Sequence, residues 1–427
     1  MHKSLAIPFL AAFLTGGTVH GTELRGHGGP VRAISVAPDG KTVATGSFDT
    51  KAIIWSLETG QASDVLVFHQ GEVNAVAALT NGRFASAGAD GRIAIWQTGR
   101  GDPVRILEGH AGPVADLEVS PDGSMLASAS WDTTVRLWPL AGGEARVLEG
   151  HGANVNALAF LTDGTLVSAG YDATVIFWPS QAGAPLVRAV MPTPLNTLVT
   201  APGDRLFVGG ADGQVRLLDR RGKVQSEVQV SRNPVIALAA TPDANYLAAA
   251  GVDGGILLLD AVSLSTIRTL DTSGVAVWSL AFAASGTTLL AGGADHLVRE
   301  WNIETGERLG AAVGGKADPM ARYAGNPDAE VFRACVACHT LDPDDGNRAG
   351  PTLHGIFGRK IASVPGYHYS PAFRAMDIVW TPETVSALFE LGPNAYTPGT
   401  KMPEQTISNA GDRAALIRFL QAETRTD

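Results

Sequence analysis

The sequence predicts an all-β propeller of seven blades, followed by a small all-α domain. Seven units of 40–42 residues follow one another and end in similar apolar strands. Within each unit, short apolar runs alternate with turn residues, which is the pattern of a four-stranded blade. The last hundred residues leave this repeat and have helical patterns near both ends.

The repeat is marked by the residue that ends the third strand of each unit. Five of the seven strands close with tryptophan, and the first four of these have the clearest apolar endings, as in Val135-Arg136-Leu137-Trp138. The seven closing positions are Trp55, Trp96, Trp138, Trp178, Leu218, Leu259 and Trp301. Their successive differences are 41, 42, 40, 40, 41 and 42 residues, so we expect seven blades of nearly equal size.

The first four units also carry a histidine, a serine or threonine, an aspartate and the closing tryptophan. In the third unit these are His110, Ser128, Asp132 and Trp138. This pattern resembles the WD40 family, in which the four side chains form a hydrogen-bonded tetrad inside the blade. Metal binding or catalysis is the alternative, but one histidine per blade beside its own partners favours a structural role.

The last three units keep the aspartate but lose the histidine. The residues at the histidine position are Met191, Ser231 and Ser273. We therefore expect incomplete tetrads in blades five to seven.

The two ends of the repeat region predict how the ring closes. Leu24-Arg25-Gly26-His27 matches Leu107-Glu108-Gly109-His110, so we expect the N-terminal segment to supply the outer strand of blade seven. The segment 307–313 competes for the same edge. We expect the propeller to span 22–310 and a linker to span 311–324.

The C-terminal domain is expected to span 325–427. We expect a first helix that ends near Phe332 and Arg333, and a last amphipathic helix over about 412–421. Three apolar residues of the last helix should pack against the first one: Leu416, Phe419 and Leu420.

The segment Cys335-Val336-Ala337-Cys338-His339 is a C-x-x-C-H motif, the attachment signature of a c-type haem. Two thiols three positions apart can form thioether bonds to the haem, and the adjacent imidazole can then face the iron. A zinc site would need two further ligands, and the chain has 2 cysteines in all. A thioredoxin-like pair would need a βαβ context.

Downstream residues strengthen this prediction. Gly350-Pro351-Thr352-Leu353-His354-Gly355, Trp380 and Tyr396-Thr397-Pro398-Gly399-Thr400-Lys401-Met402 follow the motif in order. Together they resemble class I cytochrome c of the mitochondrial and bacterial c2 branch, over about the last hundred residues.

The resemblance implies one covalent haem c per chain, bound by Cys335 and Cys338. It implies that His339 and Met402 are the axial iron ligands and that the Pro351 carbonyl accepts the other ring N–H of the histidine. It also implies four side chains around the haem or its propionates: Arg359, Tyr369, Trp380 and Thr400. Alternative iron ligands are Met320, Met376, His354 and His368.

The chain also departs from this family. Leu388 or Phe389 aligns with a tyrosine near the axial methionine, so that hydroxyl is missing, and Glu404 replaces an exposed phenylalanine. From Asn326 onward, 9 Lys and Arg face 12 Asp and Glu. A partner that recognises the lysine ring of mitochondrial relatives is therefore not expected.

The N-terminus predicts export. Lys3 precedes an apolar run over 5–14, and small or polar residues continue to Gly21, as in a secretory signal peptide over 1–21. No later run approaches the length of a transmembrane helix. The resemblance also implies that the haem is attached after export, as it is for bacterial c-type cytochromes. We therefore expect the protein to be located in the periplasm.

Charge and composition narrow the function. The net charge is −10 without a basic run, which disfavours nucleic acid as a partner. We expect a periplasmic c-type cytochrome that transfers single electrons, with the propeller as a scaffold that docks a redox partner protein or a membrane-bound respiratory complex. This prediction favours an electron carrier over an enzyme.

Two alternatives stay open. In the first, the chain is a periplasmic oxidoreductase whose propeller binds a second cofactor or substrate, with the haem as relay. In the second, the haem is a redox sensor and the propeller its output, which would require ligand exchange at Met402.

Overall fold

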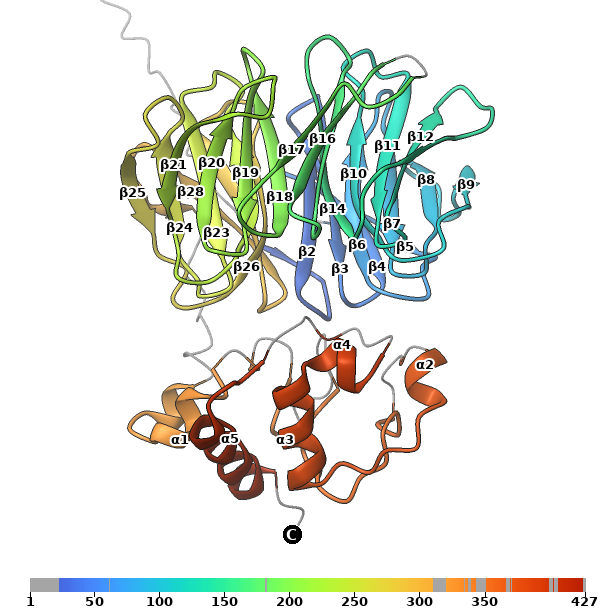
Figure 1. Ribbon diagram of the computed structural model, residues 1–427. Coiled ribbons are helices and arrows are strands. Elements are labelled where there is room, and N and C mark those ends of the chain that lie inside the picture. The colour runs from blue at the N-terminus through green and yellow to red at the C-terminus, as the bar shows by residue number, and fades with distance from the viewer. Residues whose placement is uncertain are drawn as a thin grey trace, which may run out of the picture.

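The computed structural model describes residues 23–60, 62–180, 183–309, 320–333, 335–336, 339–342, 351–365, 369, 371–398, 402 and 406–424. Figure 1 shows the strands as a ring of blades and the helices as a separate cluster. The predicted signal peptide lies outside the described residues, as do 311–319 of the predicted linker.

Each blade is an antiparallel sheet whose strands follow one another outward from the ring axis. Blades one to three contain β2 (Val31–Val36), β3 (Thr42–Ser47), β4 (Lys51–Ser56), β5 (Ala62–Val67); β6 (Val73–Ala78), β7 (Arg83–Gly88), β8 (Ile93–Gln97), β9 (Arg105–Leu107); β10 (Val114–Val119), β11 (Met125–Ser130), β12 (Thr134–Pro139), β13 (Arg146–Glu149). Blades four to six contain β14 (Val155–Phe160), β15 (Leu166–Gly170), β16 (Thr174–Trp178), β17 (Val187–Val190); β18 (Leu195–Ala201), β19 (Arg205–Gly210), β20 (Gln214–Leu218), β21 (Val224–Gln229); β22 (Val235–Ala240), β23 (Tyr246–Gly251), β24 (Ile256–Asp260), β25 (Thr266–Leu270). Blade seven contains β26 (Val277–Phe282), β27 (Thr288–Gly293), β28 (Leu297–Asn302) and two short outer strands, β1 (Leu24–Arg25) and β29 (Arg308–Leu309).

The seven inner strands form a closed ring. Each contacts the inner strand of the next blade, and β26 contacts β2, which joins blade seven to blade one. Buried apolar clusters fill the spaces between neighbouring blades, because both faces of each sheet are covered. The predicted seven-bladed propeller is confirmed.

Both predicted closing segments pair with β28. Leu24 lies opposite Val298 in an antiparallel pair, so the N-terminal segment does supply an outer strand of blade seven. Arg308 lies opposite Trp301, further along the same edge. The two segments therefore divide the edge of β28 instead of excluding one another.

An ion-pair cluster joins these two segments. The Glu23 carboxylate, whose side chain is 6% exposed, pairs with the Arg308 guanidinium and lies 3.9 Å from Nε of Arg299. Arg299 also donates a 2.8 Å hydrogen bond to Asp295. Residues from the start and the end of the propeller thus hold each other on one blade.

Blades one to four contain the predicted tetrads. In blade four, His151 Nδ1 lies 3.1 Å from the Asp172 carboxylate, and its Nε2 lies 2.7 Å from Ser168 Oγ. Trp178 Nε1 donates to the same hydroxyl at 2.8 Å. The aspartate fixes the proton on Nδ1, so the hydroxyl donates to Nε2 and accepts from the indole. The structural interpretation of these histidines is therefore confirmed.

Burial and hydrogen bonds also set the protonation states of tetrad side chains. Burial lowers the pKa of His110 and of His151, although their aspartate partners oppose this shift, so both rings are neutral near pH 7. Burial alone would raise the pKa of Asp132, but hydrogen bonds from Thr134, His110 and the Ala111 amide lower it to about 2.

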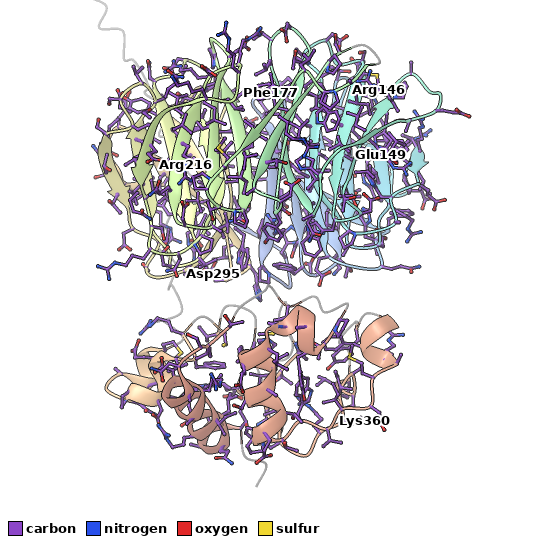
Figure 2. The ribbon with its side chains drawn as sticks, in the orientation of Figure 1. Arg146, Glu149, Phe177, Arg216, Asp295 and Lys360 are labelled. Atoms are coloured by element: carbon purple, nitrogen blue, oxygen red, sulfur yellow. The ribbon has the colours of Figure 1, made fainter. Side chains whose placement is uncertain are left out.

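Blades five to seven lack complete tetrads, as expected, but two of them gain a different contact. Arg216 forms an ion pair with Asp212, with 2.5 Å between Nη2 and Oδ2. Arg299 pairs with Asp295 in the same way. Figure 2 labels Arg216 within the blades and Asp295 at the edge of the propeller. In blade six, Ser231 donates a 2.9 Å hydrogen bond to Asp253. The arginines lie four positions after each aspartate, a signal that the sequence analysis missed.

Glu300 is an unusual residue of blade seven. The other six third strands have an apolar residue at this position: Ile54, Ile95, Leu137, Phe177, Leu217 and Leu258. The Glu300 residue is 7% exposed, and its Oε1 is buried without a hydrogen-bond partner within the described part of the chain. Burial raises its pKa to about 7.

The C-terminal part has one 3-10 helix and five α-helices within its described residues. They are η1 (Ala321–Tyr323), α1 (Pro327–Glu330), α2 (Pro371–Arg374), α3 (Pro382–Leu391), α4 (Pro393–Tyr396) and α5 (Ala410–Glu423). An isolated bridge between Lys360 and Val379 and long irregular segments accompany them. The expected all-α class therefore stays a prediction.

The expected contact between the first and last helices is present. Phe332 and Phe419 have ring centroids 5.2 Å apart, and Leu416 and Leu420 are buried in the same cluster. The expected end of the first helix was two to three residues too late, because α1 ends at Glu330 and Val331 to Arg333 form a turn. Among the helices described, none is long and apolar enough to cross a bilayer.

Replacing Ser168 with alanine should destabilise the propeller. The change leaves His151 Nε2 and the Trp178 indole N–H buried without a partner, which costs about 2 kcal/mol. Chemical denaturation followed by circular dichroism would measure this loss. Ser180→Ala, at an exposed serine in the same blade, is the control and should change little. Equal effects of both variants would contradict the tetrad's role.

Glu300→Gln should stabilise the protein in a pH-dependent way. Burial raises the Glu300 pKa from 4.5 to about 7, so the folded state binds this proton more tightly than the unfolded state does. The resulting contribution to the free energy of unfolding is complete below pH 4.5 and is lost as the pH rises through 7. The glutamine does not titrate, so the variant should gain up to about 3 kcal/mol over the wild type above pH 7. Denaturation at pH 4.5 and pH 8 measures it, with exposed Glu304→Gln as control. A gain that does not depend on pH would contradict this explanation.

Candidate functional site

The site begins at a helical turn after α1. The Cys335 amide donates to the Phe332 carbonyl at 2.8 Å, and the His339 amide donates to the Cys335 carbonyl at 2.9 Å. These bonds place the histidine one turn after the cysteine. Cys335 is 7% exposed and belongs to the C-terminal apolar core. Cys338 lies outside the described residues.

His339 is oriented by the loop that begins at Pro351. Its Nδ1 lies 2.8 Å from the Pro351 carbonyl oxygen, which can only accept, so Nδ1 carries the proton. The Leu353 amide donates to the Thr340 carbonyl at 2.8 Å and holds the loop beside the histidine. The basic lone pair of the ring is therefore on Nε2, the nitrogen that a metal would require.

Met402 belongs to the same core as Cys335. The two sulfur-containing residues share this cluster with apolar side chains of α3 and α5, among them Leu388, Phe389 and Leu416. Both candidate positions for the missing tyrosine are thus occupied by buried apolar side chains, 8% and 6% exposed. An apolar environment of this kind excludes water from a bound group.

Arg359 and Tyr369 are half-buried polar residues of the same part of the chain. The guanidinium donates to the Thr352 and His354 carbonyls at 2.7 and 2.8 Å. Burial lowers the pKa of Arg359 and raises that of Tyr369, and each side chain senses the charge of the other. The Val364 amide donates to the tyrosine hydroxyl oxygen at 3.4 Å. Two donors for a buried anion therefore lie close together.

Trp380 is attached to the arginine segment by its backbone. Its amide donates to the Arg359 carbonyl at 2.9 Å, and its carbonyl accepts from the Gly358 amide at 2.8 Å. Its indole packs on the C-terminal core. The N-cap Thr381 then starts α3, which fixes the position of the tryptophan relative to that helix.

Other predicted residues are less well placed or not described. Thr400, His368 and Glu404 lie outside the described residues. Met320 is 3% exposed and lies in the same core, so the structure does not separate it from Met402 as a ligand. The sequence analysis missed the carbonyls of Thr352 and His354, because backbone acceptors leave no signal in residue type.

The described residues fit a covalently bound haem. A macrocycle needs an apolar environment, an oriented imidazole, a thiol one turn away and donors for its carboxylates. His339, Cys335 and Arg359 supply the last three, and the cluster around Met402 supplies the first. Within the described residues, no group of three or more His, Cys, Asp and Glu is arranged to hold a metal ion by itself.

Known proteins resemble both parts of the chain. The family model "WD domain, G-beta repeat" matches residues 18–56, 60–97, 101–139, 142–179 and 264–302. These matches include the four blades with complete tetrads and blade seven. Blade five and the first three strands of blade six, where Met191 and Ser231 hold the histidine positions, lie outside these matches.

Curated relatives match a shorter segment. Cytochrome c of Cochliobolus lunatus is 44% identical over 98 residues, which is 23% of this chain and 90% of the relative. Cytochrome c of Arabidopsis thaliana is 44% identical over 98 residues and 87% of its length. Cytochrome c type-1 of Ascaris suum is 45% identical over 99 residues and 85% of its length. Over this segment the chain belongs to the cytochrome c family, and it carries that domain together with a seven-bladed propeller of WD40 repeats.

Proposed function

We propose that this protein is a periplasmic electron carrier. One covalent haem c would be bound by Cys335 and Cys338, with His339 and Met402 as axial ligands. The propeller would be a scaffold that docks a redox partner protein or a membrane-bound respiratory complex. When bound, the haem supplies an iron that takes up and releases one electron.

The observation that carries this proposal is the orientation of His339. Its Nδ1 is committed to the Pro351 carbonyl at 2.8 Å, so the ring offers Nε2 to a ligand. A histidine that follows a cysteine by one turn and is fixed in this tautomer suits an axial ligand better than a surface role. The likeness to the cytochromes c of Cochliobolus lunatus, Arabidopsis thaliana and Ascaris suum supports the same proposal.

The other residues of the site have distinct roles in this proposal. Arg359 and Tyr369 stabilise the haem carboxylates, because a buried anion needs a cation or hydrogen-bond donors. The cluster of α3 and α5 side chains would exclude water from the bound haem. Met402 would be the second iron ligand, and substrates and gases would then have no open coordination site.

The predicted signal peptide supports the proposed periplasmic location. The apolar run over 5–14 has the length of a signal peptide, and covalent haem attachment in bacteria follows export. Cleavage near Gly21 would leave Glu23 and Leu24 for ring closure, as the contacts of both residues require.

A cofactor inventory on the exported full-length chain tests the proposal. We expect one covalent haem per chain by intact mass and haem quantification, a mature N-terminus near Thr22, and no other stoichiometric metal. A second stoichiometric cofactor would favour an oxidoreductase with its active site in the propeller. A chain without covalent haem would refute the carrier.

Met402→Leu should keep the covalent haem and lose the axial thioether. The reduction potential should fall by about 0.1–0.3 V, part of the roughly 0.8 V range that axial ligands set, and the reduced protein should then bind carbon monoxide. Redox titration and absorption spectra measure both changes. Met320→Leu and Met376→Leu are the controls, because each removes an alternative thioether. A shift with either control instead of Met402→Leu would reassign the ligand.

A further inference from the structure

The chain after Met402 is attached to the end of α3 by its backbone. The Ile407 amide donates to the Phe389 carbonyl at 2.9 Å. This carbonyl has no partner within its own helix, because the residue four positions later is Pro393, which has no N–H. The proline that ends α3 therefore leaves an acceptor free for Ile407.

Arg413 attaches the same segment to α5. Its Nη1 donates to the Ile407 carbonyl at 2.7 Å and to the Ser408 carbonyl at 2.9 Å. Its backbone belongs to the first turn of α5, where the Arg413 amide donates to the carbonyl of the N-cap Asn409 at 3.1 Å. The side chain is 12% exposed, so both hydrogen bonds are largely shielded from water.

The carbonyls are the main partners of this arginine. Arg413 Nη2 also lies 3.6 Å from Oε1 of Glu390, but the glutamate side chain is 60% exposed. Water screens an exposed ion pair of this kind, and its contribution to stability is small. Hydrogen bonds from a charged donor to shielded carbonyls contribute more.

The chain before Met402 is anchored as well. Thr397 is 0% exposed, and its hydroxyl donates to the Pro393 carbonyl at 2.9 Å. Its amide donates to the same carbonyl at 2.8 Å. Met402 lies midway between Thr397 and Ile407, and it packs on the core that α3 and α5 share. These two helices lie side by side (Figure 1).

We propose that Arg413 is a positioning residue for Met402. By holding the Ile407 and Ser408 carbonyls, it fixes one end of the segment that carries the methionine and keeps the thioether on the haem iron. A segment with both ends fixed has fewer conformations than one that is held at one end. The inference rests on the proposed function, in which Met402 is an axial ligand.

Loss of the arginine should make local opening easier without unfolding the domain. Residues 406–409 have no helix or strand of their own, so their position depends on the few hydrogen bonds described above. Segments of this kind open at a lower free energy than the core of the same protein. When the segment opens, Met402 leaves the second axial position.

Imidazole binding to the oxidised, haem-loaded, full-length protein tests this inference. Imidazole can bind the iron only after Met402 has left, so at saturating imidazole the binding rate equals the opening rate. We expect Arg413→Gln to raise this rate by about tenfold, since two hydrogen bonds from a charged donor are lost. Stopped-flow absorption measures it. Arg413→Lys keeps the charge and should give an intermediate rate, and it keeps the test decisive if Arg413→Gln does not fold.

Arg418→Gln is the matched control on the same helix. Arg418 donates to Asp328 of α1 at 2.7 and 2.8 Å, so this variant also removes an arginine contact of α5. It should leave the imidazole rate unchanged, because its contact does not involve the segment after Met402. Glu390→Gln should leave the rate unchanged too, because the carbonyls hold the arginine.

Hydrogen exchange at the Ile407 amide gives a second readout that does not depend on the iron ligand. Exchange should become faster in Arg413→Gln and stay unchanged in Arg418→Gln. Equal imidazole rates in the wild type and Arg413→Gln, or equal exchange of the Ile407 amide, would overturn the role of Arg413 and leave the carrier standing. A wild type that binds imidazole as fast as Met402→Leu would refute Met402 as a ligand, and with it both proposals.

Discussion

The edge of β28 is the constraint on which the propeller depends. A ring of sheets is stable only when its last blade joins its first, and here that joint uses two short strands from opposite ends of the repeat region. Glu23 binds Arg308 and Arg299, so the joint combines backbone pairing with a nearly buried ion pair. The inner strands and the tetrads keep their positions because this ring is closed.

Much of this architecture was predictable, because each blade repeats the same physical solution. The spacing of Trp55, Trp96, Trp138 and Trp178 predicted the blades, and the serine or threonine ten residues earlier predicted the hydroxyl that the indole and the imidazole share. The sequence did not predict that β1 and β29 share the edge of β28. Strands of two residues have no pattern of their own, and their pairing depends on how much of the neighbouring strand is left unpaired. The arginine contacts in blades five and seven were also missed, because spacing alone does not predict them: Arg136 also lies four positions after Asp132, and the described residues show no ion pair between these two.

The candidate haem site shows a similar division. The motif around Cys335 and the order of later residues predicted which side chains come together, and the structure places Cys335, Trp380 and Met402 in one core. Residue type could not predict that the Arg359 guanidinium is held by two loop carbonyls, since backbone acceptors depend on loop conformation. Nor could it separate Met402 from Met320, which is buried in the same cluster.

The distance along the chain between the two partners of the closing pair has a consequence for folding. Leu24 and Val298 are about 270 positions apart, so the first outer strand cannot pair until nearly the whole propeller has been synthesised. Until then, blades one to six form an open arc, and the face of blade one that carries Ile53 and Trp55 has no neighbour. An apolar surface therefore stays exposed until the ring closes, and such a surface favours aggregation during folding.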